Sequence, residues 1–326
     1  MKPVDVLFVG AGLTTATIVS ALRGSGLSMM VVECRDHIGG NCYDYDCGQG
    51  FVSAYGRHIL HTSDNRVVEY LGRYVELEDS HYTLSAEIEW QDQLCIVPIP
   101  YQPMTEHVLG CRLSEEDIER CFFHDYSLKM WGIPYDQLPE HIRGRVPQRG
   151  DYFRNKSRLR PAIGWTATIA KMLGNTPVLL NASPEYWRHV PARRIVYCGR
   201  ADFLTDLRLE YRTLWFGWQV GRHASDTDGL NYCHLKNLHI RSMQYGPFVC
   251  WELPVTPDDD DCSPAYPFAT EANLAQYKEV CARVWERYPN LILAGRLGSY
   301  RYLDMDVAIA EALDLAAVLK RNFDNA

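Results

Sequence analysis

The N-terminal end of the chain carries the pattern that restricts the fold most strongly. Residues 4–9, VDVLFV, form a largely apolar run, and the glycine turn GAGLTT follows at residues 10–15. A segment with helical spacing comes next and ends at a glycine, and LSMMVVE at 27–33 is a second buried run that ends at Glu33. This order of elements predicts a βαβ unit, and therefore an α/β fold that contains parallel strands.

The glycine turn also predicts a dinucleotide site. Backbone N–H groups and the dipole of a helix that starts at such a turn can hold a pyrophosphate, which makes Gly10, Gly12 and Leu13 candidate cofactor residues. An acid at the end of the second strand, here Glu33, can bond ribose hydroxyls. A glycine turn alone is weak evidence, but the surrounding strand, helix, strand and acid favour this interpretation. One departure is that Thr15 stands where the third glycine is usual.

The segment RDHIGGN, which follows the acid, resembles the flavoprotein form of this unit. It places Arg35, Gly40 and Asn41 shortly after Glu33. The cofactor that we expect is therefore FAD.

The rest of the chain alternates between helical and strand-like segments. Helices are predicted at 64–74, within 103–145 with a start at 114–116, and at 164–173, 272–288 and 306–322; a hairpin is predicted at 82–100 with its turn at 91–93. Runs at 176–182, 193–199, 210–220 and 248–255 are predicted to form a substantial antiparallel sheet, and the basic segment 146–161 to form a loop. The run 291–295 is a further buried strand.

Composition narrows the range of partners. The formal net charge of −8 provides no basic field, so neither nucleic acid nor an anionic membrane surface is an expected partner. No run of 18 apolar residues exists, and the opening segment lacks the basic-then-apolar form of a signal peptide, so we expect a cytoplasmic protein. The eleven cysteines contain no CxxC pair, and the aspartates at 258–261 lack the spacing of a calcium loop, so no metal site is expected.

Short motifs across nearly the whole chain resemble the UDP-galactopyranose mutase family. They are VGAGL, HIGGN, YGRHILHT, YSLKMWG, DYF, GWT, YRTLWF, LNY with an arginine ten residues after its asparagine, AYP and GRLGSYRYLDMD. The resemblance implies an FAD-binding Rossmann-type domain with an inserted helical bundle and an antiparallel sheet domain. The expected ranges are 1–80 with 190–225 and 285–326 for the FAD domain, 99–148 for the helical insert, and 81–98 with 149–189 and 226–284 for the sheet.

The resemblance also implies an activity, the interconversion of UDP-galactopyranose and UDP-galactofuranose. In this family the nitrogen N5 of reduced FAD attacks the anomeric carbon, and UDP is the leaving group. The expected partners are a UDP-hexose, a flavin reductant such as NAD(P)H and, in a homodimer, a second copy of the chain. Another UDP- or dTDP-linked hexose, deoxy or N-acetylated, is an alternative substrate, and an FAD-dependent oxidase is an alternative activity.

Site residues follow from the same resemblance, position by position. The resemblance implies that His58, Arg296 and Asp304 are the catalytic residues. These three residues, and Met305, are also expected to contact the cofactor. Arg145 and Arg241 correspond to the arginines that clamp the diphosphate, since guanidinium groups form charge-assisted bonds with it. The other substrate residues are the phosphate-binding Tyr152, Tyr266 and Tyr302, the uridine platform Phe122, Phe123 and Tyr126, and also Trp131, Arg212, Asn231 and Leu84.

Some of these residues have simpler explanations or depart from the family pattern. Phe122 and Phe123 at helical spacing could be core residues, and the arginines could be surface charges. Arg57 precedes His58 where a small residue or proline is usual, and Leu84 replaces a sugar-facing asparagine. An oxidase would need neither the arginine pair nor the uridine platform, whereas the intact His58, Arg296 and Asp304 argue against an inactive FAD-binding homologue.

Overall fold

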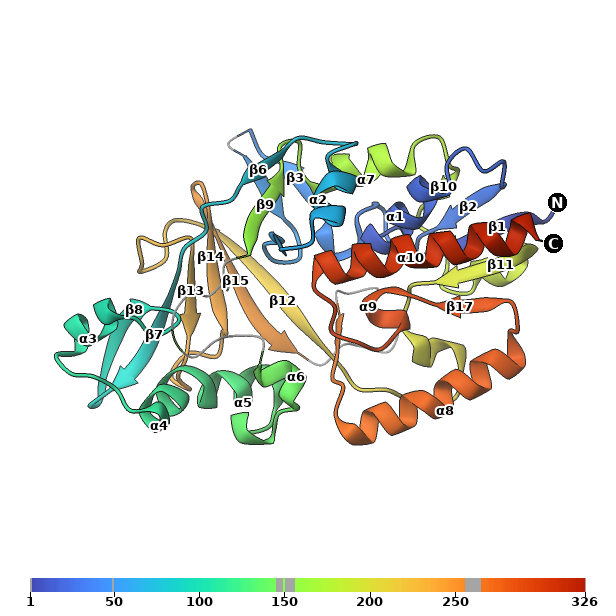
Figure 1. Ribbon diagram of the computed structural model, residues 1–326. Coiled ribbons are helices and arrows are strands. Elements are labelled where there is room, and N and C mark those ends of the chain that lie inside the picture. Colours follow the sequence, from blue (N-terminus) through green and yellow to red (C-terminus); the bar gives the residue numbers. More distant parts are fainter. Residues whose placement is uncertain (1, 49, 145–148, 150–155, 256–264, 326) are drawn as a thin grey trace.

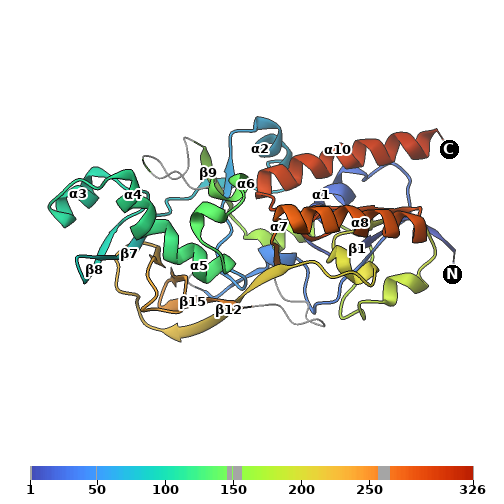
Figure 2. The same cartoon turned by 90° about the horizontal axis from the view of Figure 1, so that it is seen from below.

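A computed structural model of the chain describes residues 2–48, 50–144, 149, 156–255 and 265–325. A parallel sheet lies at the end of the molecule that holds both termini, and a larger, mostly antiparallel sheet lies toward the other end (Figure 1). Figure 2 shows the same separation from below. The α/β class with a second, antiparallel sheet is thus confirmed.

The parallel sheet is covered by helices on both faces. Its strands lie in the order β10 (Val178–Leu179), β2 (Met29–Val32), β1 (Val4–Val9), β11 (Ala192–Tyr197) and β17 (Leu291–Leu293). Alternate residues of β1 point to opposite faces of the sheet. On one face, Phe8 joins a core with helices α1 (Leu13–Ala21), α7 (Trp165–Leu173) and α10 (Met305–Asp324). On the other face, Leu7 joins a core with helix α8 (Glu271–Arg287). Burial on both faces explains why successive residues such as Leu7 and Phe8 of β1 are both apolar.

Two strands of this sheet correct the sequence-based assignment. The runs at 176–182 and 193–199 were expected in the antiparallel sheet, but β10 and β11 pair in parallel with β2 and β1. An apolar run shows that a strand is buried without showing which strand lies beside it.

The larger sheet has seven strands and is antiparallel except between β13 and β7. Its order is β16 (Ala265–Pro267), β12 (Tyr211–Val220), β15 (Phe248–Val255), β14 (Arg241–Tyr245), β13 (Gly229–Tyr232), β7 (Leu84–Trp90) and β8 (Gln93–Pro98). The hairpin and the runs at 210–220 and 248–255 are confirmed. Strand β12 nevertheless belongs to this sheet, although the range 190–225 was assigned to the FAD domain.

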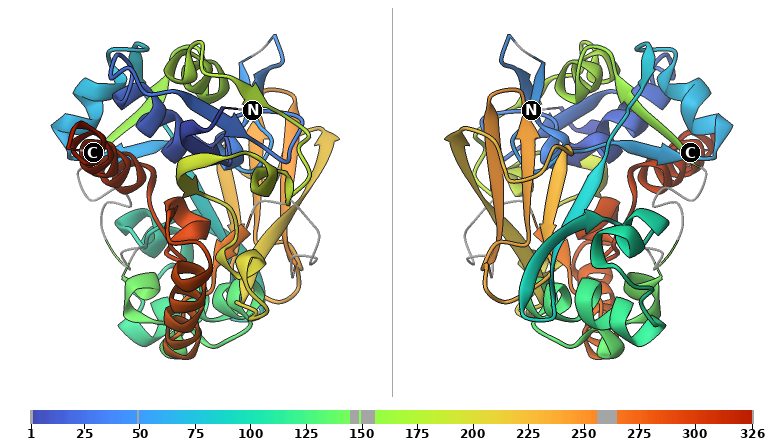
Figure 3. Two further views of the ribbon diagram at one scale, coloured as in Figure 1. Left: turned by 90° about the vertical axis from the view of Figure 1, so that its right-hand side faces the viewer. Right: turned by 90° about the vertical axis from the view of Figure 1, so that its left-hand side faces the viewer.

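The helical insert packs against one face of the seven-stranded sheet (Figure 3). It contains α3 (Pro103–Leu109), α4 (Glu115–Ile118), a π-helical turn at Glu119–His124, α5 (Asp125–Trp131), a 3₁₀ turn at Tyr135–Gln137 and α6 (Glu140–Arg143). The predicted start at residue 114 is confirmed, because the Ser114 hydroxyl accepts a hydrogen bond from the backbone N–H of Asp117 and caps α4.

Short elements connect the two larger sheets. Strands β3 (Asp44–Asp46) and β4 (Phe51–Ser53) form a ribbon, and β9 (Ser157–Pro161) lies between β5 (Leu60–Thr62) and β6 (Leu77–Asp79). The last five residues of the predicted loop 146–161 are therefore a strand. The remaining helices are α2 (Asn65–Leu71) and α9 (Gly295–Gly298), with 3₁₀ turns at Gly40–Cys42, Tyr186–His189 and Ala201–Leu204.

Several features are absent from the described part of the chain. None of its helices combines the length and apolar character that a bilayer crossing needs. No three metal-ligating side chains come together in the described ranges, and the cysteines there are free thiols. The aspartates at 258–261 lie outside those ranges.

Candidate active site

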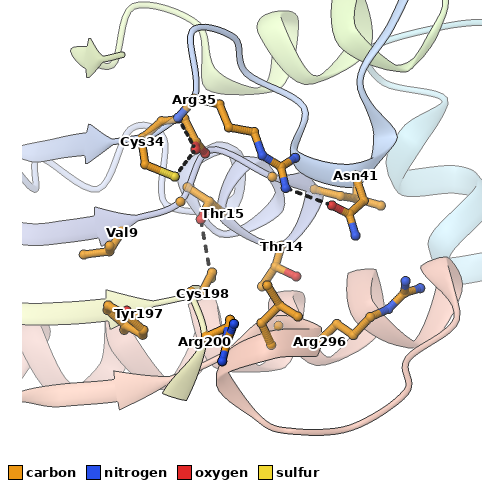
Figure 4. Close-up of a pocket in the computed structure, with 18 of the residues that line it drawn as sticks. Val9, Thr14, Thr15, Cys34, Arg35, Asn41, Tyr197, Cys198, Arg200 and Arg296 are labelled. Atoms are coloured by element: carbon orange, nitrogen blue, oxygen red, sulfur yellow. Dashed lines mark hydrogen bonds between the residues drawn. The ribbon is translucent and has the colours of Figure 1, made fainter. Parts of the chain in front are cut away.

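A pocket runs along the carboxyl ends of strands β2, β1, β11 and β17, the edge of a parallel sheet where α/β proteins bind ligands. Figure 4 shows a close-up of this pocket. Ten predicted cofactor residues line it: Gly10, Gly12, Leu13, Glu33, Arg35, Gly40, Asn41, His58, Arg296 and Met305. The eleventh, Asp304, is the N-cap of α10.

Two glycine segments form the wall of the pocket beside α1. Gly10 has a φ of +102°, and a Cβ added there would lie 3.3 Å from the Cβ of Cys198. Gly40 has a φ of +56°, and its added Cβ would lie 3.1 Å from the Cα of Gly12. Side chains at these positions would strain the backbone and separate the segments. Their absence leaves the N-terminal N–H groups of α1 accessible to a pyrophosphate.

Thr15 shows how the chain accommodates the missing third glycine. Its side chain is fully buried, and its hydroxyl lies 3.6 Å from the Sγ of Cys198 at the end of β11. Thr15 therefore fits in place of the third glycine because its hydroxyl contacts the residue that follows β11.

Glu33 fixes the turn from the neighbouring strand end. Its Oε2 accepts a hydrogen bond from the backbone N–H of Ala11 at 2.7 Å, and its Oε1 accepts one from that of Arg35 at 2.9 Å. The side chain of Arg35 in turn donates to Asn41 at 3.2 Å (Figure 4). The glycine wall, the helix N-terminus and the acid at the end of β2 together fit the adenosine diphosphate half of FAD.

The N-terminus of α10 faces the other end of the pocket. Asp304 has extended backbone angles and its carbonyl accepts the first helical hydrogen bond, from Ala308, while Met305 lines the pocket. The unpaired N–H groups of a helix start carry partial positive charge. This end of α10 can therefore stabilise negative charge on a bound reduced flavin.

His58 lies at the same end of the pocket as a neutral imidazole. Burial, together with the nearby charge of Arg296, lowers the pKa of His58 to about 4. Its Nδ1 lies 2.8 Å from the carbonyl oxygen of Gly56, which can only accept, so Nδ1 carries the proton. The Nε2 of His58 is consequently a hydrogen-bond acceptor near neutral pH.

Arg296 joins this end of the pocket to two predicted substrate residues. The rings of Tyr266 and Tyr302 are stacked with centroids 5.9 Å apart, and the Arg296 guanidinium lies 5.2 Å and 4.8 Å from their centroids. The same guanidinium donates to the carbonyl of Leu303 at 2.7 Å. Burial and then the neighbouring Tyr302 raise the pKa of Tyr266 to about 12, so its phenol remains a donor near neutral pH.

Strand register brings other predicted substrate residues onto one face of the larger sheet. Residues that are paired directly across neighbouring strands point to the same face. Phe216 is paired with Glu252, Glu252 with Arg241, Arg241 with Asn231, and Asn231 with Ala86, so these five side chains lie on one face. The period of two along each strand adds Arg212 and Leu84 to the same face. Arg212 is paired with Tyr266, so this face is continuous with the tyrosine pair beside Arg296.

Glu252 is a charged residue of this face that sequence reasoning missed. It is fully buried, and Arg241 donates to its Oε2 through Nη2 at 2.7 Å and Nε at 3.1 Å. Burial opposes the charge on Arg241, but the Glu252 carboxylate together with the neighbouring Tyr126 and Tyr82 outweighs it, so the pKa of Arg241 lies well above its usual value. A lone acid inside the apolar run FVCWELPV was the signal in the sequence.

Three buried polar atoms on this face have no hydrogen-bond partner within the described residues. They are Oε1 of Glu252, Oδ1 of Asn231 and Nε of Arg212. Such groups are uncommon inside proteins because each one loses its hydration without replacement. Their gathering on one face is expected where a polar ligand binds.

The aromatic candidates divide into core and site residues. Phe122 is fully buried, and the ring of Phe123 packs 5.0 Å from that of Tyr135, so both contribute to the core of the insert. Tyr126 is half-buried and close enough to Arg241 to contribute to the raised pKa of that arginine.

Trp131 and Arg212 form a second group with Phe268. The ring of Trp131 stacks on Phe268 at 5.5 Å, and Arg212 lies over Phe268 at 5.2 Å while donating to the Trp131 carbonyl at 2.9 Å. This group anchors the end of α5 to β12. Arg145 and Tyr152, two further predicted substrate residues, lie outside the described residues.

A comparison with family models agrees with these observations. The model described as UDP-galactopyranose mutase matches residues 121–302, more than half of the chain, and one described as an NAD(P)-binding Rossmann-like domain matches residues 9–74. The chain belongs to the UDP-galactopyranose mutase family. It is therefore an isomerase, and FAD is its cofactor.

Individual relatives match the chain over nearly its full length. A protein named "Probable UDP-galactopyranose mutase" from Klebsiella pneumoniae is 27% identical to this chain. The match covers 97% of this chain and 94% of that protein. The dTDP-fucopyranose mutase of Escherichia coli is 24% identical, over 97% of this chain and 98% of the relative. The crystal structure of a reduced UDP-galactopyranose mutase shares the fold with a TM-score of 0.71 at 13% identity, covering 99% of this chain and 96% of that one.

Proposed function

We propose that this family member interconverts UDP-galactopyranose and UDP-galactofuranose with reduced FAD. The observation that carries the proposal is the continuity of one polar surface. It runs from His58 and Arg296 in the cofactor pocket, over the stacked tyrosines, to Arg212, Arg241 and Asn231 on the sheet face. A flavin at one end and a nucleotide diphosphate at the other would meet at the sugar between them.

The fixed cations suit a leaving group that must return. Arg241 is held by Glu252, and Arg296 by the Leu303 carbonyl and two rings, so neither guanidinium needs reorganising when a diphosphate binds. Charge-assisted hydrogen bonds from such groups can retain a detached UDP. We assign this role to Arg241 and Arg145, with Tyr152, Tyr266 and Tyr302 donating to phosphate oxygens.

The other residues act on the sugar and the cofactor. Bound reduced flavin would supply the nitrogen nucleophile for the anomeric carbon. The neutral His58 can accept a hydrogen bond through Nε2, and Asp304 at the start of α10 can accept one from a sugar hydroxyl. We assign uridine binding to Tyr126 and Phe123, with Phe122 supporting them from the core and Trp131 beside them.

The test is the dependence of isomerisation on the redox state of the flavin. Dithionite-reduced enzyme incubated with UDP-galactofuranose should yield UDP-galactopyranose on chromatography, whereas the air-oxidised enzyme should yield almost none. Consumption of oxygen with an amine substrate, and no isomerisation after reduction, would instead identify an oxidase.

A dTDP- or UDP-linked 6-deoxyhexose is a second candidate substrate. Leu84 presents an apolar side chain on the sheet face, two residues along β7 from Ala86 in the row with Asn231. A leucine favours a methyl group over a hydroxyl, and the Escherichia coli relative is named a dTDP-fucopyranose mutase. Turnover of a panel of UDP- and dTDP-linked hexoses by the reduced enzyme separates the two candidates.

We further propose NAD(P)H as the reductant, the cytoplasm as the location and a homodimer as the assembly. Anaerobic loss of the oxidised flavin absorbance on addition of NADH or NADPH tests the first. Fractionation of the producing cells tests the second, and light scattering of the eluted protein tests the third.

A further inference from the structure

Arg200 is a buried cation on the wall of the cofactor pocket that the assigned functions leave unused. It lies just beyond the carboxyl end of β11, two residues after Cys198, whose Cβ faces Gly10 of the pyrophosphate turn. The Arg200 side chain is only 8% exposed. Figure 4 shows it among the residues that line the pocket, near Cys198 and on the opposite side of the pocket from Arg35.

The guanidinium of Arg200 is held rigidly. Its Nε and Nη2 donate to the two carboxylate oxygens of Asp202 at 3.2 and 2.8 Å, and Asp202 is itself buried. The rings of Phe203 and Tyr211 have centroids 4.4 and 4.6 Å from the Arg200 Cζ. A bidentate pair with two ring contacts fixes the plane of the guanidinium and offsets its charge.

The remaining nitrogen, Nη1, is buried and has no hydrogen-bond partner among the residues that the structure describes. Leaving a buried donor unpaired is unfavourable, and more so for a charged group. Because the ion pair with Asp202 already offsets the charge, Nη1 offers a fixed, directional N–H rather than a general attraction for anions. Since Arg200 lines the cofactor pocket, a ligand bound there can supply the acceptor that Nη1 lacks.

We propose that Arg200 is a cofactor-binding residue whose Nη1 donates a hydrogen bond to the adenosine diphosphate half of FAD. The position supports this half rather than the flavin ring, because Arg200 follows the strand that abuts the pyrophosphate turn, whereas the flavin end is marked by His58 and Arg296. The proposal rests on FAD as the cofactor and is independent of which sugar is isomerised.

The experiment compares FAD affinity in Arg200→Met with that in a matched control, Arg188→Met. Arg188 is also ion-paired, with Glu185 at 2.6 Å, and packs against Trp187 and Tyr288, but it does not line the pocket. The holoenzymes are diluted, and the Kd for FAD is obtained from the rise in flavin fluorescence on release, without any substrate. Unfolding temperatures of both variants report their structural cost.

We expect Arg200→Met to raise the Kd for FAD by roughly 10- to 100-fold, as the loss of one charged hydrogen bond predicts. Arg188→Met should leave the Kd within about twofold of the parent, and riboflavin, which lacks the diphosphate and adenosine, should bind parent and Arg200→Met equally. Should Arg200→Met fail to fold, Arg200→Lys keeps the cation opposite Asp202 but removes the planar donor, and should show the same loss. An unchanged FAD Kd in either folded variant would overturn the proposal.

Discussion

Arg241 and Glu252 face each other across strands β14 and β15, where two guanidinium nitrogens of Arg241 donate to a single oxygen of Glu252. Glu252 has no exposure to solvent, and Arg241 is the cation that compensates its buried carboxylate. The pair therefore serves both the sheet and the substrate site: Glu252 fixes the cation that we assign to the diphosphate.

Removing Glu252 should destabilise the protein, because it leaves Arg241 charged and largely buried without its carboxylate. We expect Glu252→Ala to lower the free energy of unfolding by about 3 kcal/mol. Glu311→Ala is the matched control, since it breaks the exposed Arg301–Glu311 pair and should cost about 1 kcal/mol or less. Denaturant unfolding of both variants checks this, and equal costs would contradict the assigned role of burial.

Replacing Arg241 or Arg145 by alanine should weaken UDP binding and leave the flavin in place. Loss of one charge-assisted partner of a diphosphate predicts a Kd raised roughly 30- to 4000-fold. Titration calorimetry with UDP measures the change, and flavin absorbance together with the melting temperature separates it from misfolding. The exposed Arg301→Ala serves as control, and UDP affinities equal to that of the parent in both variants would exclude the diphosphate assignment.

The buried imidazole of His58 should make the protein less stable in mild acid. Its folded pKa of about 4 lies below the unfolded value, so the unfolded chain binds the proton first as the pH falls. Stability from this residue is complete above an unfolded pKa of about 6.5, declines between there and about 4, and then levels off. The parent should therefore lose about 2 kcal/mol more than His58→Gln between about pH 7 and about pH 5.

Equilibrium unfolding of the parent and His58→Gln at the two pH values tests this difference. Glutamine retains a donor for the Gly56 carbonyl but does not titrate, so the other histidines contribute equally to both proteins. Parallel pH profiles for the two proteins would show that His58 is not held neutral.

Leu84 should discriminate between a hydroxyl and a methyl on the sugar. Leu84→Asn should raise kcat/KM for UDP-galactofuranose relative to its 6-deoxy analogue, by up to about 100-fold, because the amide can bond the added hydroxyl. Leu84→Met conserves volume and apolar character and is the control. If Leu84→Asn leaves the ratio unchanged, Leu84 does not contact the sugar.

Short sequence patterns predicted the turns, helix starts and hairpins, because these elements are determined by residues that are close together in the sequence. The GAG turn, the helix after it and Glu33 are defined within a few residues, and the structure places them in the pocket wall. The hairpin and the capped start of α4 are similar cases. Strand partners were harder, because the apolar residues of β10 and β11 could have paired in either sheet.

The residues that were missed owe their character to distant segments. Glu252 stands out in the sequence as a lone acid in an apolar run, but its role depends on Arg241 of the adjacent strand. The role of Arg200 depends on Asp202 and two rings that fix its guanidinium. Neither forms a spaced motif in the sequence. Phe122 matched the family pattern for a uridine platform, but its fully buried ring agrees with the core position that its helical spacing also allowed.

The measurement that tests the central claim most directly is positional isotope exchange in UDP-galactose that carries a heavy oxygen isotope between the anomeric carbon and the β-phosphorus. If UDP leaves, stays held by the arginines and returns, rotation of the terminal phosphate should move the label into non-bridging positions. We predict this exchange with dithionite-reduced enzyme and not with oxidised enzyme. Conversion between pyranose and furanose by the oxidised enzyme, or by the reduced enzyme with the label still wholly in the bridge, would contradict an account in which UDP leaves and returns.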